Sequence, residues 1–162
     1  MKSKIVLFKT NKKGRSYENL NFIENLMIVH HFTKNVFKYS AIKELDSNLN
    51  ETHAKILLFV HKHEHKQMSK INEFIGIQKG AFTTSVDILI DNGYVVKVKS
   101  KKDKRFTNLE LTQKGEQIAI ELEENLYKSI NDMFDSMEHE ERKEINEALN
   151  TLSKFCIKNR RK

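Results

Sequence analysis

Six basic side chains and one acid lie within the nine residues 97–105, whose sequence is KVKSKKDKR. Segments of alternating apolar and polar residues flank this run, so it is predicted to form the tip of a β-hairpin. Six positive charges less one negative charge give the tip a net charge of +5, which attracts a polyanion such as a phosphate backbone. The predicted chemistry is therefore electrostatic binding.

The two flanking strands each have one face to bury and one to expose. Tyr94, Val96 and Val98 share a face of YVVKVK, and Leu109 and Leu111 share a face of FTNLEL. Two short strands are not stable alone in water, so the hairpin must pack against neighbouring helices.

A helix near Gln78 to Asn92 supplies a second set of groups that could contact DNA. Its apolar stripe consists of Phe82, Val86, Leu89 and Ile90, and it ends at Asn92-Gly93. The opposite face is polar near its N-terminus, where the candidate contacts are Gln78, Lys79, Gly80, Thr83 and Thr84.

Each of these side chains has a chemistry that suits a DNA groove. Gln78 can read adenine, Lys79 suits guanine or phosphate, and the threonines can bond phosphate or touch a thymine methyl. Gly80 costs about 1 kcal/mol of helix propensity relative to alanine. Its missing side chain would allow a base or the sugar-phosphate backbone to come close.

A short helix from Met68 to Ile75 and a turn at Gly76 precede this polar helix, and the basic hairpin follows it. That order is the order of a winged helix-turn-helix. Residues 68–93 (MSKINEFIGIQKGAFTTSVDILIDNG) and 94–115 (YVVKVKSKKDKRFTNLELTQKG) resemble the DNA-binding region of the multiple-antibiotic-resistance-regulator (MarR) family.

The hairpin carries the most specific part of the resemblance. Asp103 and Arg105 match the family's Asp-x-Arg pattern, and residues 111–115 match its Leu-Thr-x-x-Gly pattern. The resemblance implies that Arg105 enters a minor groove while Asp103 holds its guanidinium or braces the wing. The other wing residues expected to bind DNA are Lys99, Lys101, Lys102 and Lys104.

The rest of the chain reads as helices around this region, so the predicted fold is mostly α with a small β-hairpin wing. Helices are expected from Tyr17, from an N-cap at Asn50 to about His63, from an N-cap at Thr112, and from an N-cap at Ser136. We expect a basic N-terminal arm over 1–16 and a single domain over 17–162. Within that domain, 50–114 is the winged helix-turn-helix with its wing at 94–111, and 17–48 and 116–162 are dimerisation helices.

Composition is consistent with an intracellular globular protein. The chain has 162 residues, a formal net charge of +7 and a single cysteine, and it contains neither a membrane-length apolar run nor a signal-peptide pattern. Both ends and the hairpin tip are basic, whereas residues 115–150 hold eleven acids and three bases. We expect a cytoplasmic protein polarised toward one anionic partner, double-stranded DNA.

The family resemblance implies a homodimeric repressor acting on an inverted-repeat operator. Apolar residues on the terminal helices, including Leu20, Ile23, Leu149, Leu152 and Phe155, favour a two-fold pair whose reading helices lie roughly 34 Å apart. By analogy with the family, a small aromatic effector would bind between the dimer helices and the reading domain. No cofactor is expected.

Three alternative interpretations stay open. His61, His63 and His65 suggest metal sensing, although only His61 and His65 share a helical face. Cys156 suggests oxidant sensing, although its apolar neighbours favour a buried core residue. A basic hairpin and basic tails also suit a non-specific or architectural nucleic-acid binder. An enzyme is not expected, because the chain lacks the phosphate-loop, nucleophile-elbow and zinc-protease motifs.

Overall fold

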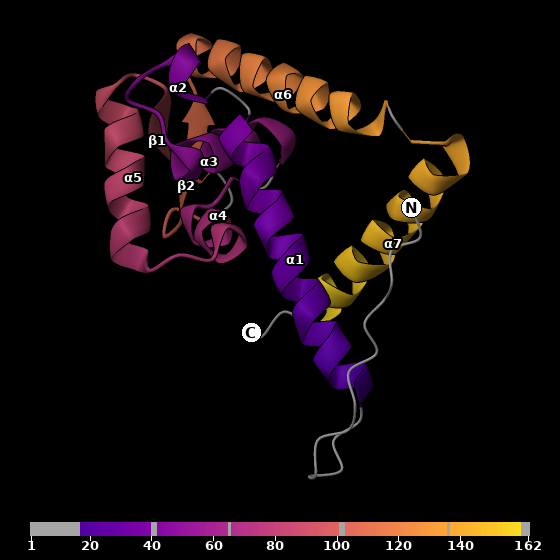
Figure 1. Ribbon diagram of the computed structural model, residues 1–162. Helices are drawn as coiled ribbons and strands as arrows, with labels where there is room; N and C mark the ends of the chain where they lie inside the picture. The colour runs from indigo at the N-terminus through magenta and orange to yellow at the C-terminus, as the bar shows by residue number, and fades with distance from the viewer. Residues whose placement is uncertain (1–16, 40–41, 65, 101–102, 136, 160–162) are drawn as a thin grey trace. The chain divides into compact units, whose positions relative to one another are not determined.

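The computed structural model describes residues 17–39, 42–64, 66–100, 103–135 and 137–159 (Figure 1). Its elements in chain order are α1 (Tyr17–Tyr39), α2 (Ile42–Leu45), α3 (Glu51–Lys62), α4 (Met68–Ile75), α5 (Lys79–Asp91), β1 (Val95–Lys99), β2 (Thr107–Leu111), α6 (Gln113–Phe134) and α7 (His139–Lys158). The predicted fold class, mostly helical with one antiparallel hairpin, is confirmed. The chain divides into two compact units, Met1–Val36 and Phe37–Lys162.

The first unit contains most of α1, the helix predicted to begin at Tyr17. Its apolar side chains face solvent rather than a core: Ile23, Met27 and Phe32 are all exposed. An exposed apolar surface of this kind on a helix is typical of an interaction surface.

The core of the second unit lies around α3, which packs against α4, α5, α6 and β2. The core consists of Ile42, Leu49, Ala54, Ile56, Leu57, Val60, Ile71, Phe82, Val86, Leu89, Tyr94, Val95, Leu109, Ala119 and Leu122. The predicted stripe of α5 is largely confirmed, because Phe82, Val86 and Leu89 are buried while Ile90 is half-buried.

Local capping signals set most of the helix ends. The Asn50 side chain accepts a hydrogen bond from the His53 backbone N–H at 3.0 Å, and Thr112 Oγ1 accepts one from the Gly115 N–H at 3.0 Å. Gly76 and Gly93 adopt the left-handed conformation, with φ of 74° and 72°. A Cβ atom is strained in that conformation, so these turns favour glycine.

Two expectations about the helices were wrong or incomplete. The last helix has Glu138, not Ser136, as its N-cap, and Ser136 lies outside the described residues. Glu141 supports this start, because its side chain accepts a hydrogen bond from the Glu138 backbone N–H at 3.2 Å. The one-turn helix α2 was not predicted. Its Ile42 is buried in the core.

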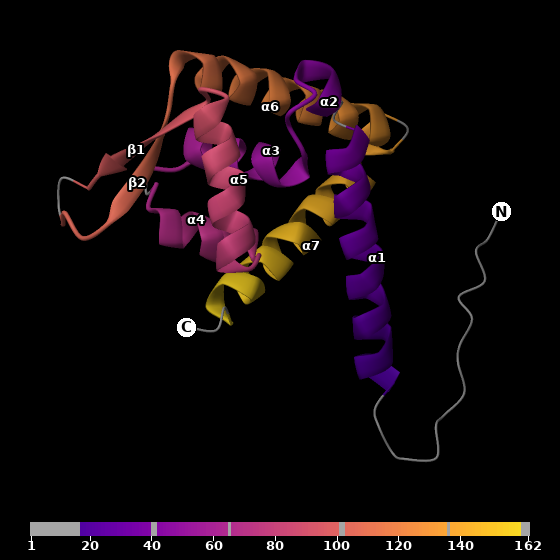
Figure 2. The same ribbon diagram turned by 90° about the vertical axis from the view of Figure 1, so that its left-hand side faces the viewer.

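The hairpin is antiparallel, with Val95 opposite Leu111, Lys97 opposite Leu109 and Lys99 opposite Thr107 (Figure 2). Side chains opposite each other lie on one face of the hairpin. Val95 and Leu109 are buried while Val96 is exposed, so the face of Val95, and not that of Val96, packs on the core. Alternation reveals two faces, but only the position of the helices decides which is covered.

The outer edge of β2 also pairs with the segment before α4, which the sequence did not indicate. Gln67 and Asn108 form an isolated antiparallel bridge, and the Leu109 N–H donates to the Lys66 carbonyl at 2.9 Å. The hairpin is therefore tied to the helix-turn-helix on its β2 side as well as through the turn at Gly93.

Candidate nucleic-acid interface

The turn between α4 and α5 fixes the orientation of the polar helix. Gly76 ends α4, and its N–H donates to the Asn72 carbonyl at 2.9 Å. Ile71 of α4 and Phe82 of α5 are both buried, so the two helices are held by the same core. With its apolar side anchored, α5 presents its polar side outward.

The N-terminal part of that side carries the five predicted contact residues. Gln78, Lys79, Gly80 and Thr84 are exposed and Thr83 is half-buried, so all five are accessible near the start of α5. The partial positive charge of the helix N-terminus adds to the ammonium of Lys79. This surface suits contact with an anion and with base edges.

The threonine hydroxyls are already engaged as donors. Thr83 Oγ1 donates to the Lys79 carbonyl at 3.0 Å, and Thr84 Oγ1 donates to the Gly80 carbonyl at 3.2 Å. With its proton used inside the helix, a threonine offers acceptor lone pairs and a methyl group to a partner. That chemistry suits an exocyclic amino group or a thymine methyl better than a phosphate oxygen.

No packing contact among the described residues explains glycine at position 80. A Cβ atom built there would have no heavy atom within 4 Å, in contrast to Gly115, where a Cβ would lie only 2.9 Å from the Tyr94 carbonyl carbon. The helix could accommodate alanine at position 80. The cost of Gly80 to helix propensity is therefore not offset by any packing constraint among the described residues.

On the wing, Asp103 holds Arg105 as the sequence pattern suggested. Arg105 Nη2 donates to Asp103 Oδ2 at 2.8 Å and Nε donates to the same oxygen at 3.0 Å, while the Arg105 backbone N–H donates to Asp103 Oδ1 at 3.0 Å. The hydrogen bond from Arg105 lowers the pKa of the Asp103 carboxyl, and the hydrogen bond to Asp103 raises the pKa of Arg105. The Arg105 side chain is 86% exposed, so the carboxylate orients the guanidinium without burying it.

The predicted wing lysines are less uniform than the sequence suggested. Lys99 and Lys104 are exposed, and Lys101 and Lys102 lie outside the described residues. Lys97, in the same basic run, differs from them. Its Nζ donates to Asp87 Oδ1 of α5 at 2.7 Å.

The base of the hairpin is a dense set of internal contacts that sequence reasoning missed. The Thr112 N–H donates to the Tyr94 carbonyl at 3.0 Å, and Thr112 Oγ1 donates to the Gly93 carbonyl at 2.7 Å. Gly115 lies directly against the Tyr94 backbone. The Leu-Thr-x-x-Gly pattern therefore has a structural role. It joins the start of α6 to the turn where α5 meets β1.

The phenol of Tyr94 completes this base. Its hydroxyl donates to Asp46 in the loop before α3, which lowers the pKa of Asp46. Burial, and then the bond to Asp46, raise the pKa of Tyr94 to about 12. The Lys114 ammonium lies 4.3 Å from the centroid of the Tyr94 ring.

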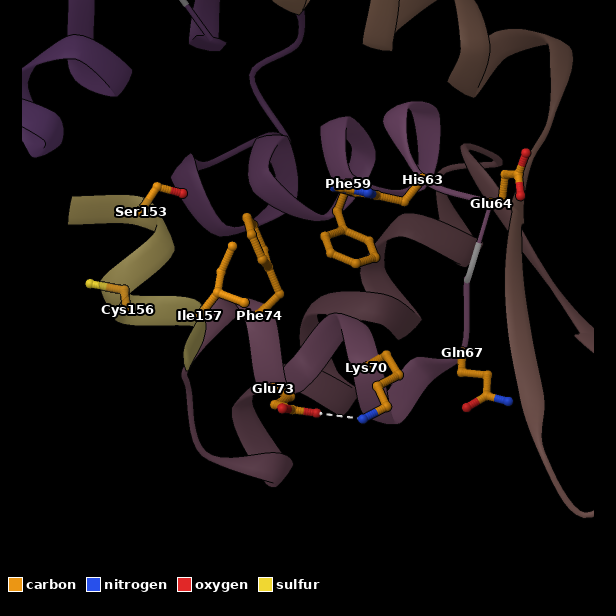
Figure 3. A pocket seen from close by; sticks show the side chains of 10 residues that line it. All are labelled: Phe59, His63, Glu64, Gln67, Lys70, Glu73, Phe74, Ser153, Cys156 and Ile157. Atoms are coloured by element: carbon orange, nitrogen blue, oxygen red, sulfur yellow. Dashed lines mark hydrogen bonds and ion pairs between the residues drawn. The ribbon is translucent and has the colours of Figure 1, made fainter. Parts of the chain in front are cut away.

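A pocket of about 620 Å³ is lined by residues of α3, α4 and α7 and of the segment between α3 and α4 (Figure 3). Phe59 and Phe74 form its apolar wall, with ring centroids 4.8 Å apart, and the Phe59 ring lies 4.3 Å from that of His63. Ile157 of α7 lies beside Phe74, while Cys156 points away from the two rings. The pocket combines an aromatic wall with a polar rim.

Of the residues that suggested metal or oxidant sensing, His65 lies outside the described residues, whereas His61 and Cys156 can be described. His61 Nδ1 lies 2.8 Å from Glu116 and its Nε2 lies 3.5 Å from Glu123, which joins α3 to α6. In the described part of the chain, no three His, Cys, Asp or Glu side chains are arranged to hold a metal ion. The expectation that Cys156 is a buried core residue was wrong, because it is exposed on α7, whose described side chains include none that is buried.

The helices α4 and α5 form a helix-turn-helix whose second helix has its polar side outward, and a basic hairpin follows it. This arrangement defines a winged helix-turn-helix protein. The model of the MarR family matches residues 49–107, which run from the residue before the Asn50 cap into β2. The HTH-type transcriptional regulator SarZ of Staphylococcus aureus is 30% identical over 118 residues, covering 73% of this chain and 75% of SarZ. This chain belongs to the MarR family and is a transcriptional regulator of the MarR type.

Two further comparisons extend this result. The HTH-type transcriptional regulator Hpr of Bacillus cytotoxicus is 33% identical over 93 residues, which is 57% of this chain but only about half, 49%, of Hpr. A MarR family transcriptional regulator of Listeria monocytogenes, solved in complex with a 26mer DNA, shares the fold with a TM-score of 0.71. That match covers 83% of this chain and 90% of the other at 17% identity.

Membrane insertion is not indicated by any helix that the structure describes. None of these helices combines the length and the apolar character needed to cross a bilayer.

Proposed function

We propose that this chain is a homodimeric transcriptional repressor that binds an inverted-repeat operator through the N-terminal face of α5 and the tip of the wing. The observation that carries the proposal is the outward polar face of α5 combined with an exposed Arg105 held by Asp103. A helix can enter a major groove while an arginine enters the neighbouring minor groove. The Listeria relative, solved with DNA, supports DNA as the partner.

The proposal divides the work between two groups of residues. Gln78, Lys79, Gly80, Thr83 and Thr84 read the major groove. In the wing, Arg105 occupies the minor groove and Asp103 orients it. Lys99, Lys101, Lys102 and Lys104 neutralise phosphates, which makes binding strong but salt-dependent.

Dimerisation is proposed through the terminal helices, residues 17–48 and 116–162. On α7, Leu149, Phe155 and Ile157 are exposed, and on α1 the side chains of Ile23 and Met27 are exposed as well. These apolar surfaces support a partner of the same kind, since a two-fold pair would cover the same patch on both copies. The pair would place two reading helices about one DNA turn apart, roughly 34 Å.

A small aromatic effector is proposed to regulate binding. The pocket lined by Phe59, His63 and Phe74 supports this class of ligand, because aromatic rings favour stacking against a flat apolar molecule. Its walls come from α3, α4 and α7, so a ligand there would act on both the reading region and a proposed dimer helix. The regulator is expected to work in the cytoplasm, where its operator is.

The test begins with the full chain and a library of random duplexes. Repeated selection should enrich one inverted repeat, which should be bound by ~10³-fold or more over unrelated duplex at the same salt. Light scattering should give a dimer at micromolar concentration. Enrichment of no sequence would favour the non-specific or architectural alternative, and a monomer bound to a single half-site would overturn the dimer.

Two variants then test the assigned roles on the enriched duplex. Arg105→Ala should weaken binding and reduce the preference for A·T pairs beside the half-site, because a narrow minor groove favours arginine. Thr84→Ala should change the preferred bases within the half-site instead. If both variants weakened all sequences equally, the division between reading helix and wing would be wrong.

A further inference from the structure

Lys97 and Asp87 connect the wing to the reading helix at a point beyond the Gly93 turn that links α5 to β1. Lys97 Nζ of β1 donates to Asp87 Oδ1 of α5 at 2.7 Å, ten residues apart in sequence. The segment between them contains the end of α5 and the left-handed turn at Gly93, where the chain reverses. A contact beyond that turn limits how far the hairpin can swing relative to α5.

The ion pair with Asp87 distinguishes Lys97 from Lys99 and Lys104, the other described lysines of its run. Lys97 lies opposite Leu109, which is fully buried, so it is on the face of the hairpin that packs on the protein. Lys97 and Lys99 share this face and are both exposed, and Lys104 is exposed beside Arg105 at the tip. The sequence predicts Lys99 and Lys104 as DNA contacts and assigns no role of its own to Lys97.

Asp87 raises a separate question, because a carboxylate on the reading helix opposes a polyanion. It lies one turn beyond Thr83 and Thr84 on α5, and half of its side chain, 50%, is exposed. Lys97 is 38% exposed, and an ion pair this open to solvent adds little to folding stability. Stability is therefore not a sufficient reason for the pair.

We propose that Lys97 and Asp87 are positioning residues that set the wing at the angle DNA binding requires and neutralise the carboxylate beside the groove. Lys97 then acts through Asp87 rather than through a phosphate. This inference rests on the proposed DNA-binding function and adds to it a specific link between the two contact surfaces.

A double-mutant cycle tests the link. Lys97→Met, Asp87→Asn and the double variant are compared with wild type for binding to the duplex that wild type selects from a random library, across a range of salt concentrations. Lys97→Met should weaken specific binding by roughly tenfold, and Asp87→Asn in the same chain should recover part of that loss. The affinity of the double variant should therefore differ from the product of the two single effects by a factor of at least about three. The salt dependence should stay close to that of wild type.

Lys104→Met is the matched control at the exposed tip. A lysine that contacts phosphate should reduce the slope of log affinity against log salt by about 0.9 when removed, and should weaken unrelated duplex as well. If Lys97→Met behaved like this control, or if the two substitutions simply multiplied, the positioning role would be overturned. Failure of wild type to bind any duplex would instead overturn the proposed function, which separates the two outcomes.

Discussion

The base of the wing differs from the wing tip and the polar face of α5 in where its residues find partners. At the base, Thr112, Tyr94 and Gly115 are fixed by contacts inside the protein. At the tip, Arg105 is held by Asp103 but remains open to solvent, and on α5 Gly80 has open space around it. The residue types at the base are explained by contacts inside the protein. Those at the tip and on α5 are not, and they lie where DNA is proposed to bind.

The same difference distinguishes the roles of two sequence patterns in the wing. The Leu-Thr-x-x-Gly pattern and the Asp-x-Arg pattern lie within thirteen residues, 103–115, and both support the family resemblance. The first is a structural joint and the second presents a charge. Substitutions in the first should change stability, and substitutions in the second should change DNA binding at constant stability.

The largest effect is expected for Gly115→Ala. A methyl group there would overlap the Tyr94 carbonyl, and because the obstacle is backbone it cannot move aside cheaply. We expect a loss of roughly 3 kcal/mol in the free energy of unfolding, measured by urea denaturation followed by circular dichroism. Gly76→Ala is a useful comparison, because its Cβ meets no atom and its cost comes from backbone conformation alone. A Gly115→Ala protein as stable as wild type would contradict the assignment of the base as a joint.

The next effect is expected for Tyr94→Phe, which removes the hydroxyl that donates to Asp46. A hydrogen bond to a charged group contributes about 1.5–3 kcal/mol, so the variant should lose stability on that scale near neutral pH. Asp46 has a lowered pKa in the folded state, so its contribution is present above its ordinary value of 3.8 and is lost as pH falls through the lowered pKa.

The Tyr94 hydroxyl gives the opposite sign. Its pKa is raised from 10.0 to about 12, so its contribution is complete below pH 10 and is lost as pH rises toward 12. The difference in unfolding free energy between wild type and Tyr94→Phe should therefore be constant from about pH 5 to 9 and should shrink at both extremes. A difference that did not vary with pH would assign the effect to packing alone.

Local signals explain which parts of this fold could be predicted. The caps at Asn50 and Thr112 and the turn at Gly76 depend on residues within one helical turn, and all three appear where the sequence indicated them. The sequence did not decide which face of β1 is buried, and it did not indicate the bond from Tyr94 to Asp46. Both depend on segments distant in sequence, which periodicity does not bring together.

The candidate site shows the same limit. Spacing identified the polar face of α5, and the family resemblance implied the Asp103–Arg105 pair, because each is contained in a short segment. They did not indicate that Lys97 pairs with Asp87, because the two residues lie on either side of the Gly93 turn. An acid on the polar face of a helix, followed by a lysine in the next strand, is the signal that would have suggested this pair.

Gly80→Ala should have effects of opposite sign on stability and on binding. With open space around the new methyl group, the free energy of unfolding should increase by up to about 1 kcal/mol from helix propensity. If DNA approaches α5 at this position, the same methyl group should weaken binding to the selected duplex. Urea denaturation and a binding titration on the same preparation check both parts. A more stable protein with unchanged affinity would remove Gly80 from the interface.

The smallest change is expected for Asp103→Asn, and its direction is the informative part. The substitution removes a negative charge from the wing, so a purely electrostatic tip should bind every duplex more tightly. If Asp103 instead orients Arg105, specific binding should weaken severalfold while binding to unrelated duplex stays equal or becomes tighter. Unfolding by urea should change little, because the Arg105 side chain is 86% exposed and an ion pair this open to solvent adds little to stability. Titration of both duplexes at two salt concentrations decides between an oriented arginine and a simple cluster of charge.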